Sequence, residues 1–532
     1  MAKSKQQKTI KQTRKTNKPP QKKQSKKVVQ PQKVKQPKKT FVTQQSLNSE
    51  IKSICDIMRR SNCAGAMQYV PELTWLLFLR ILDANEKKEE IKAKIQHNDF
   101  IPSLQSPYRW SDWGNQDGKT RNKLVEGTIG SYFDFINTKL IPHLKSLREK
   151  PGATSRQRVI SEIMSSINNV RIDTEKNFLD ICDKIDGITN DNIDDTHIFT
   201  LSQIYEGLLL KMGEKGNDGG QFFTPREIIR AMVRTVKPEI GDKVYDPCCG
   251  TGGFLVQAYN YMFESAKNNP NKLHTLKHST LFGREKENLI YPITLANMIL
   301  HDIELPAIWY GNTLTGNEIF GGLFSGAPSK FEVILTNPPF GGKEGKEAQT
   351  NFSYRTSATQ VLFLQHVINS LKDDGRCGIV IDEGVLFRSN EIAFVQTKRK
   401  LLDECDVYCI VSLPSGVFSA AGAGVKANIL FFNKGKRTEK IWYYDLSDIK
   451  VGKRTPFTID RFDDFFKLLP ERADSERSWT VTRETIEKNN FDMKAVNPNR
   501  KIEEDTRTPE ELIALIEAKQ VEINEALREL KG

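Results

Sequence analysis

Four consecutive residues, Asn337, Pro338, Pro339 and Phe340, follow the apolar segment FEVILT and carry the most specific chemistry in the sequence. The two prolines fix φ and remove two N–H donors, so the loop is expected to be stiff and the Pro338 carbonyl to lack a competing neighbour. The Asn337 side-chain oxygen and that carbonyl can together accept both hydrogens of one exocyclic amine. This favours the pyramidal amine, whose lone pair can attack an electrophilic methyl group, while Phe340 offers a face to the target ring. Because Asn-Pro-Pro also occurs in plain loops, neighbouring segments must decide between the two interpretations.

A glycine-rich turn in the segment KVYDPCCGTGGFL supplies the second set of candidate residues. Asp246 ends a predicted strand, and four turn residues then lead into a predicted helix: Gly250, Thr251, Gly252 and Gly253. Glycines at the carboxyl end of a strand let the backbone approach a ligand closely. Glu285 closes the next predicted strand, where a carboxylate can accept hydrogen bonds from both ribose hydroxyls of an adenosine. A tight turn without a ligand explains the glycines alone, but together with Glu285 they predict an adenosyl ligand.

The identity of that ligand follows from its charge. No GxxxxGK[ST] sequence occurs, so the phosphate-binding loop of an ATPase is not supported. An acidic residue beside the turn suits an ammonium group better than a pyrophosphate. The methionine end of S-adenosylmethionine offers such a group, so S-adenosylmethionine is the expected cofactor. The eight cysteines show no CxxC spacing, and no metal site is predicted.

Short apolar segments alternate with longer helical ones from about residue 220 to 435, which is typical of an α/β domain with a parallel sheet. The predicted strands are 243–246, 280–285, 307–310, 332–336, 376–381, 408–413 and 427–432. The predicted helices are 225–236, 253–267, 287–301, 358–372 and 391–404. The last two strands are joined by a loop alone, so we expect the sheet to end in an antiparallel hairpin.

The 532 residues suggest about three domains at roughly 150 residues each. Residues 1–40 hold fifteen basic residues and no acidic one, and their low apolar content predicts a disordered basic tail. The tail accounts for the net charge of +12, and contact with a polyanion or a purely solubilising role are equally open. Residues 41–195 are expected to form a helical N-terminal domain, in which Pro71 lies in the first turn of a helix. Leu73, Leu76, Leu77 and Ile81 follow it at helical spacing.

The C-terminal part is expected to form an extension over 436–507, which opens with the strand-like KIWYYDL, and a helix over 508–532. Thr508 and Glu511 form a capping box at the start of that helix. Its apolar stripe consists of Leu512, Ile516, Ile523, Ala526, Leu527 and Leu530. Because about three heptads are marginal alone, a partner helix is slightly favoured over docking on the chain's own body. No apolar run approaches the ~18 residues of a membrane span, and no secretory signal is present, so we expect a soluble cytoplasmic protein.

Three segments, GQFFTPREI (220–228), DPCCGTGGFL (246–255) and TNPPFGG (336–342), together resemble the amino-methyltransferases of DNA. With ELTWLLFLRIL, YEGLL, LHDIE, GNTL, LPSGVF, NILFFNKG and KRTPFT, the chain is similar from about residue 46 onward to the modification subunit of type I restriction–modification systems. The resemblance implies a doubly wound S-adenosylmethionine-dependent methyltransferase domain over 196–435. It also implies site-specific methylation of adenine at N6, without a covalent intermediate.

The resemblance further implies that QFFTPR binds the methionine end of the cofactor. The residues concerned are Gln221, Phe222, Phe223, Thr224, Pro225 and Arg226. From the residues themselves, we expect Thr224 to be the N-cap of a helix that begins at Pro225, with Glu227 completing a capping box. The resemblance also implies that Asn312, in GNTL, contacts the cofactor's adenine, although many other amino-methyltransferases have Asp there.

The partners implied are double-stranded DNA, a separate specificity subunit, a second copy of this chain and a motor-nuclease subunit. A dedicated target-recognition domain commonly exceeds ~100 residues, and the part after residue 435 leaves no room for one. Three alternatives stay open. In cytosine-N4 methyltransferases, which polarise an amine in the same way, the tetrapeptide tends to begin with Ser. In enzymes that methylate protein glutamine it usually ends with Tyr. A non-catalytic assembly subunit would retain only the fold. Cytosine-C5 chemistry is not supported, because Cys248 and Cys249 lie in the cofactor turn, and His301 is interpreted as structural.

Overall fold

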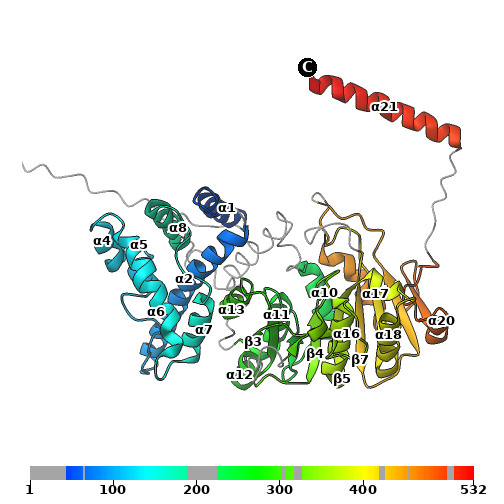
Figure 1. Ribbon diagram of the computed structural model, residues 1–532, viewed down its shortest axis with the longest axis horizontal. Coiled ribbons are helices and arrows are strands. Elements are labelled where there is room, and N and C mark those ends of the chain that lie inside the picture. Colours follow the sequence, from blue (N-terminus) through cyan, green and yellow to red (C-terminus); the bar gives the residue numbers. More distant parts are fainter. Residues whose placement is uncertain are drawn as a thin grey trace, which may run out of the picture. The chain divides into compact units, whose positions relative to one another are not determined.

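The computed structural model describes residues 44–63, 66–187, 224–301, 303, 306–316, 326–418, 426–452, 455–499 and 508–531 (Figure 1). The predicted tail, and Gln221, Phe222 and Phe223 of the predicted cofactor segment, lie outside these residues. Two compact units are distinguished, 1–40 and 41–532, and all described residues belong to the second. No helix among the described residues has the length and apolar character needed to cross a membrane.

One nine-stranded sheet forms the centre of the second unit, in the order β3-β2-β1-β4-β5-β7-β6-β8-β9. Its strands are β1 (Val244–Asp246), β2 (Leu281–Glu285), β3 (Ala307–Tyr310), β4 (Phe331–Thr336), β5 (Leu371–Asp382), β6 (Cys405–Ser412), β7 (Ala427–Lys434), β8 (Lys440–Asp445) and β9 (Ser478–Thr482). Strands β1 to β5 pair in parallel, with Val244 of β1 opposite both Leu281 and Val333. All seven predicted strands are present, because each is a short apolar run bounded by turn residues; six are largely buried, and in β3 only Ile308 is fully buried.

The predicted antiparallel hairpin consists of β6 and β7, and β7 also pairs antiparallel with β5. The expectation that the hairpin ends the sheet is wrong. Strand β8 pairs parallel with β6, and β9 pairs antiparallel with β8. The reason is apolar burial: Ile441, Trp442 and Tyr443 of β8 are all at most 2% exposed, so this segment forms part of the same core.

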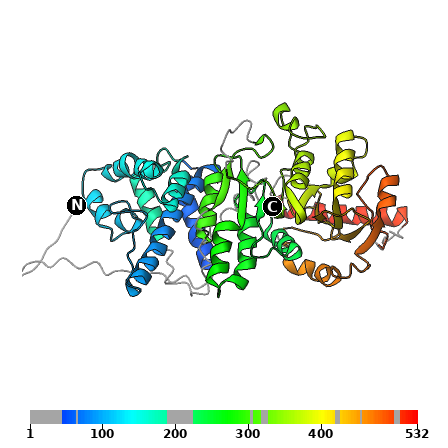
Figure 2. The same cartoon turned by 90° about the horizontal axis from the view of Figure 1, so that it is seen from below.

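Helices cover both faces of the sheet (Figure 1). Residues of β4 alternate between two core clusters: Val333 and Leu335 belong to the cluster that includes α10, α11 and α13, and Ile334 belongs to the cluster that includes α16 and α18. Figure 2 shows α18 in yellow and α19 in orange on opposite sides of the strands. The helices of this part are α10 (Arg226–Val236), α11 (Gly253–Ala266), α12 (Pro270–Ser279), α13 (Tyr291–Leu300), α15 (Lys346–Gln349), α16 (Thr359–Ser370), α17 (Glu383–Phe387), α18 (Ile392–Glu404), α19 (Asp463–Leu468), α20 (Arg483–Lys488) and α21 (Pro509–Lys531).

The N-terminal part is helical, as predicted. Its α-helices are α1 (Gln44–Arg60), α2 (Ala66–Ile95), α3 (Trp110–Trp113), α4 (Lys119–Val125), α5 (Ser131–Asp134), α6 (Ile141–Ser146), α7 (Ser155–Met164) and α8 (Glu175–Gly187). Helix α2 begins at Ala66, so Pro71 lies inside it rather than in its first turn. The preceding residues extend the helix because Tyr69 and Val70 are buried. The predicted capping box of α21 is present: Thr508 and Glu511 exchange hydrogen bonds of 2.8 and 3.3 Å.

Candidate active site

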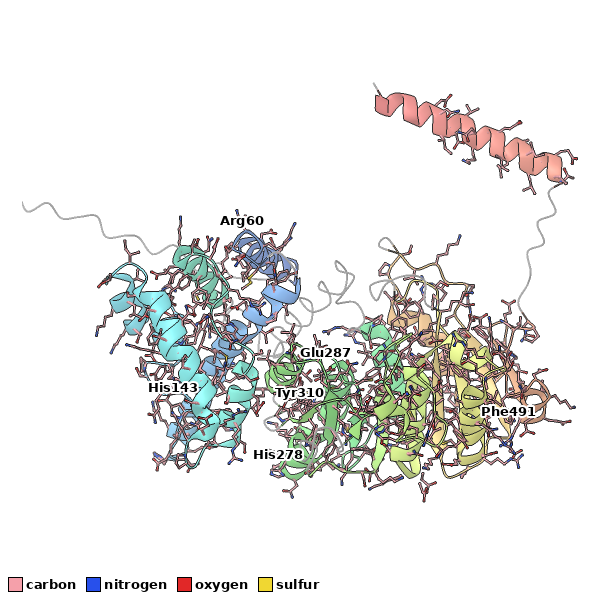
Figure 3. The ribbon with its side chains drawn as sticks, in the orientation of Figure 1. Arg60, His143, His278, Glu287, Tyr310 and Phe491 are labelled. Carbon is pink, nitrogen blue, oxygen red and sulfur yellow. The ribbon has the colours of Figure 1, made fainter. Side chains whose placement is uncertain are left out.

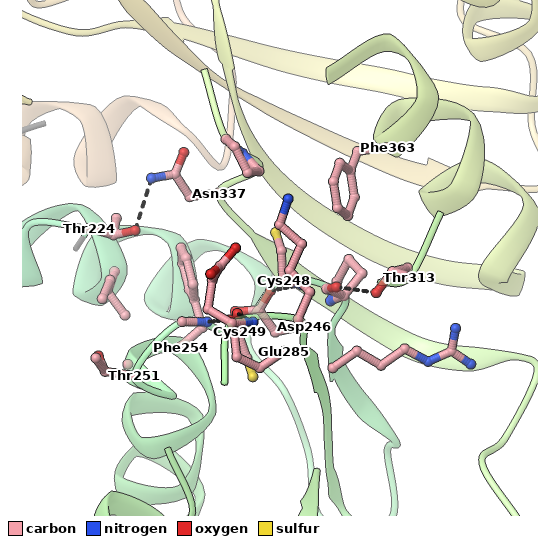
Figure 4. A pocket seen from close by; sticks show the side chains of 18 of the residues that line it. Thr224, Asp246, Cys248, Cys249, Thr251, Phe254, Glu285, Thr313, Asn337 and Phe363 are labelled. Carbon is pink, nitrogen blue, oxygen red and sulfur yellow. Dashed lines mark hydrogen bonds between the residues drawn. The ribbon is translucent and has the colours of Figure 1, made fainter. Parts of the chain in front are cut away.

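The candidate site lies at the point in the sheet where the strand order reverses. Strand β1 is flanked by β2 on one side and by β4 on the other. In open α/β sheets, ligands bind at such a switch point, outside the carboxyl ends of the strands. Asp246 ends β1 and Asn337 directly follows β4, and both line one pocket (Figure 4). The two candidate segments identified in the sequence therefore converge on the same edge.

Asp246 connects the ends of β1 and β4. Its Oδ1 accepts hydrogen bonds from the Thr336 hydroxyl at 2.7 Å and from the Cys248 N–H at 3.2 Å. The side chain is 1% exposed, and burial, together with the nearby Glu285 carboxylate, raises the pKa of Asp246 to about 7. A buried carboxylate of this kind is suited to a cationic ligand group, because a positive charge beside it stabilises its ionised form.

The turn after Asp246 has the conformation that its glycines predict. Gly250 and Gly252 have φ values of 53° and 83°, a region that side-chain-bearing residues rarely adopt, and α11 begins at Gly253. The Gly250 N–H donates to Glu285 Oε2 at 2.9 Å. This contact joins the turn after β1 to the end of β2.

Glu285 is buried at the end of β2, and burial raises its pKa to about 7. Its second oxygen accepts the Glu287 N–H at 2.8 Å, and Figure 3 shows Glu287 just beyond this edge of the sheet. Each carboxylate oxygen keeps a second lone pair, so Glu285 can still accept hydrogen bonds from hydroxyl groups. The structure thus brings Asp246, Glu285 and the glycine-rich turn together, as the spacing predicts.

Asn337 is oriented by a residue that sequence reasoning had assigned to another role. Its Nδ2 donates to the Thr224 hydroxyl at 2.9 Å, and its buried Oδ1 has no hydrogen-bond partner among the described residues (Figure 4). The predicted capping box with Thr224 is wrong, because the N-cap of α10 is Pro225 and the helix begins one residue later. The Thr224 side chain is therefore available to hold Asn337.

The other residues of the tetrapeptide differ in part from expectation. The buried Pro338 carbonyl is not free of competing donors, because Gln360 Nε2 on α16 donates to it at 3.1 Å. The contact with Gln360 could not be predicted from the sequence, since Gln360 lies 22 residues farther along the chain. Pro339 lines the pocket, whereas Phe340 is half-buried and packs edge-on against Phe418, with 5.3 Å between the ring centroids. Phe340 is not among the described residues that line the pocket.

Of the segment QFFTPR, Thr224 and Arg226 line the pocket. Burial lowers the pKa of Arg226 to about 10, still well above neutrality, so its guanidinium remains a cation that can pair with a carboxylate. Asn312 also lines the pocket; its Oδ1 accepts the Leu314 N–H at 3.0 Å and its Nδ2 donates to Glu344 at 3.3 Å.

Several lining residues escaped sequence reasoning: Gln257, Asn260, Glu344, Thr359 and Phe363. Thr359 and Phe363 are four residues apart on a helix, and this spacing places a hydroxyl and an aromatic ring on one face. That signal was readable in the predicted helix 358–372. His301 also lines the pocket, but its Nδ1 lies 2.8 Å from the Asn297 carbonyl and burial lowers its pKa to about 4, in keeping with a neutral structural histidine.

The sheet is doubly wound, and two features lie at its switch point: a glycine-rich turn suited to an adenosyl ligand, and an Asn-Pro-Pro-Phe loop that carries hydrogen-bond acceptors. Together they define the class of amino-methyltransferases. The family model described as N-6 DNA Methylase matches residues 196–507, and that described as HsdM N-terminal domain matches residues 47–167. The chain accordingly belongs to the N-6 DNA methylase family, and the relatives below place it among the methylase subunits of type I restriction enzymes.

The chain is 33% identical over 509 residues to the type I restriction enzyme EcoEI methylase subunit of Escherichia coli, covering 91% of this chain and 97% of that protein. A crystal structure of a modification subunit of a putative type I restriction enzyme from Vibrio vulnificus YJ016 is 31% identical, with a TM-score of 0.73 and coverage of 88% and 99%. A chain from a structural study of the assembly of the type I R-M system is 37% identical, with a TM-score of 0.71 and coverage of 92% and 98%. The chain is thus an adenine-specific DNA methyltransferase of the type I modification subunits.

Proposed function

We propose that this chain transfers a methyl group from S-adenosylmethionine to N6 of an adenine flipped out of duplex DNA, at a site chosen by a separate specificity subunit. Family membership supports the reaction class. The assignment of residues rests on one observation above all: Asn337 lines the same pocket as Asp246 and Glu285, and its buried Oδ1 has no hydrogen-bond partner among the described residues. An acceptor kept open in this place suits a ligand that donates a hydrogen bond.

The residues present fit S-adenosylmethionine, which supplies an electrophilic methyl group on a sulfonium. Glu285 would accept the ribose hydroxyls, Asp246 would face the ammonium group, and Asn312 would contact the adenine ring. Arg226 is the cation that would pair with the methionine carboxylate. The turn residues 250–253 would let the backbone approach the ligand closely, since glycines at 250, 252 and 253 leave no side chain in the way.

On the acceptor side, Asn337 and Pro338 would orient and polarise the target amine. The hydrogen bond from Asn337 Nδ2 to Thr224 fixes which end of the amide faces the pocket, so Oδ1 is the atom that accepts. The Pro338 carbonyl uses one lone pair for Gln360 and keeps the other for the second hydrogen of the amine. Pro339 keeps this loop stiff, and proton loss would follow attack.

Phe340 is the proposed stacking partner of the flipped base. Its edge-on contact with Phe418 leaves part of the ring exposed, so the base would use that remaining face. Because Phe418 supports the ring from the other direction, the stack would be held in one orientation.

The proposed partners are double-stranded DNA, the specificity subunit, a second copy of this chain and a motor-nuclease subunit, and the proposed location is the cytoplasm. Helix α21 supports the subunit contact. Its apolar side chains Ile513, Ile516, Val521 and Ile523 are each more than half exposed. Exposed apolar side chains on a capped helix are typical of a surface that pairs with another helix.

The deciding experiment replaces Asn337 by Ala in the full chain, assembled with its specificity subunit. We expect methylation to fall by at least about 100-fold, because an acceptor that acts in the transition state is lost, while the Kd for S-adenosylmethionine stays within about threefold. Methylation is measured with labelled cofactor, and the modified nucleoside is identified after digestion. Retained activity would refute the role of Asn337, and label on cytosine would replace adenine as the target.

A further inference from the structure

Helix α13 lies beneath the glycine-rich turn and contributes two polar side chains to it. The Thr294 hydroxyl donates to the Gly250 carbonyl, and Asn297 Nδ2 donates to the Thr251 carbonyl at 2.8 Å. Both side chains are at most 1% exposed. Buried polar side chains on a packed helix require partners, and the Thr294 hydroxyl and the Asn297 Nδ2 find theirs in the turn proposed to bind the cofactor. The Thr294 hydroxyl also lies 3.0 Å from the Ile290 carbonyl of its own helix.

The Gly250 peptide groups are consequently held from two sides. The carbonyl accepts from Thr294, and the N–H donates to Glu285, the proposed ribose acceptor. Gly250 has a φ of 53°. In the unfolded chain a glycine adopts this conformation among many others, so contacts with other residues must hold it in the folded protein. Loss of the Thr294 contact would free the turn and would also disturb the donor that orients Glu285.

Close approach between the turn and α13 depends on a second glycine. A Cβ atom at position 252 would lie 3.3 Å from Thr294 Cγ2 and 3.5 Å from Met298 Sδ. The first distance is tighter than ordinary van der Waals contact, so a side chain at position 252 would push Thr294 away from the Gly250 carbonyl.

The end of α13 contacts the N-terminal helices. Ile299 and Leu300 line a small cavity together with Phe78 and Leu82 of α2 and Arg156 of α7. Arg156 makes a bidentate ion pair with Glu89 of α2, at 2.9 and 3.1 Å, and this pair ties the two helices together. Helix α13 therefore connects the helical part to the proposed cofactor turn.

We propose that Thr294 and Asn297 are positioning residues for cofactor binding, and that packing of α2 and α7 against α13 keeps them in place. The proposal rests on the proposed function, since it requires S-adenosylmethionine to bind at this turn. It extends that function to residues that touch neither the cofactor nor the target base. Its prediction is a change in cofactor affinity, with little change in the chemical step.

The first test uses Thr294→Val in the full chain, which keeps the shape of the side chain and removes its donor. We expect the Kd for S-adenosylmethionine, measured by titration calorimetry, and its KM to rise roughly 5- to 30-fold, with kcat within about threefold. Thr294→Ser keeps the hydroxyl and should restore the affinity. Asn297→Asp, which replaces the donor with a carboxylate facing the Thr251 carbonyl, should raise the Kd as well.

A matched control is available in Thr397→Val. Thr397 is a buried threonine on α18 whose hydroxyl meets no hydrogen-bond partner within the described ranges, and the variant should leave the Kd unchanged. Wild-type affinity in both Thr294→Val and Asn297→Asp would overturn the proposal. Failure of the wild-type chain itself to bind S-adenosylmethionine would instead refute the proposed function.

The second test addresses the helical part. Leu82→Ala truncates a side chain at the cavity shared with α13, and Leu144→Ala makes the same change on α6, outside the residues that line that cavity. Both variants should lower the melting temperature, but only Leu82→Ala should raise the Kd for S-adenosylmethionine, by at least about threefold. Equal affinity in the two variants would disprove the link between the helical part and the turn.

Discussion

Asp246 and the Oδ1 atom of Asn337 are both buried beside the pocket, yet the two side chains use their oxygens differently. Asp246 Oδ1 already accepts two hydrogen bonds, whereas Asn337 Oδ1 accepts none from the part of the chain that the structure describes. A buried acceptor without a partner costs roughly 1–3 kcal/mol in the free protein, and a bound amine would remove this cost. The acceptor is thus oriented before the substrate arrives, and Thr224 is the residue that orients it.

Thr224→Val should therefore reduce methylation without affecting the cofactor. The variant loses the acceptor for Asn337 Nδ2, so the amide can turn and present the wrong atom to the base. We expect kcat to fall roughly 10-fold, with the Kd for S-adenosylmethionine nearly unchanged, in single-turnover assays and cofactor titrations. Thr224→Ser keeps the hydroxyl and serves as the control. A wild-type rate in Thr224→Val would mean that Asn337 is oriented by other contacts.

Cofactor affinity should depend on pH near neutrality. Burial raises the pKa values of Asp246 and Glu285 to about 7, and a cationic ligand prefers the ionised carboxylates. Below about pH 7 binding must displace protons, so the Kd for S-adenosylmethionine should rise roughly 10-fold or more from pH 8 to pH 6. Glu285→Gln should bind more weakly and show a shallower pH dependence. A Kd that is flat across this range would contradict the assignment of these carboxylates to the site.

The same raised pKa values have the opposite effect on the stability of the chain without cofactor. Between about pH 4 and about 7 these two acids are largely protonated when folded but ionised when unfolded. The folded state therefore binds more protons, and their contribution to the free energy of unfolding decreases as pH rises through this window.

Among the elements, strands and helices marked by a local apolar pattern could be predicted from the sequence. Which strands pair with one another could not. Strand β3 was predicted with its observed bounds, and α10, α16 and α18 to within two residues, because each is an apolar run or stripe with clear ends. The position of β7 between β5 and β6, and the extension by β8 and β9, depend on pairing between distant segments. The contacts of Asn337 with Thr224 and of Pro338 with Gln360 escaped prediction for the same reason.

The turn between β1 and α11 gives a prediction at this scale. Gly252→Ala places a side chain at φ 83° and brings its Cβ to 3.3 Å from Thr294 Cγ2, so both the backbone and the contact with α13 are strained. We expect a loss of roughly 1–2 kcal/mol of stability and weaker cofactor binding. Gly152→Ala is the control, since Gly152 has a φ of 75° with open space around it. It should lose similar stability in thermal unfolding yet bind the cofactor normally.

For the whole molecule, α21 is notable because nearly all of its described side chains are exposed. Deletion of residues 508–532 should impair assembly with the specificity subunit, because the exposed apolar residues of the helix are lost, and should leave cofactor affinity unchanged. Assembly is measured by co-purification and analytical ultracentrifugation. Ile516→Ser should weaken the complex, whereas Lys519→Ser, an exposed polar position on the same helix, should not. Normal assembly of the deletion would leave α21 without a role in the complex.

The continuation of the sheet through β8 and β9 has a practical consequence for any shortened form of this protein. A fragment that stops at residue 435 would uncover the outer edge of β6, where Cys409, Ile410 and Val411 are now paired with β8. A long apolar strand with unpaired N–H and C=O groups invites pairing with another chain. Such a fragment would be prone to aggregate, even though every residue of the proposed catalytic pocket is retained in it.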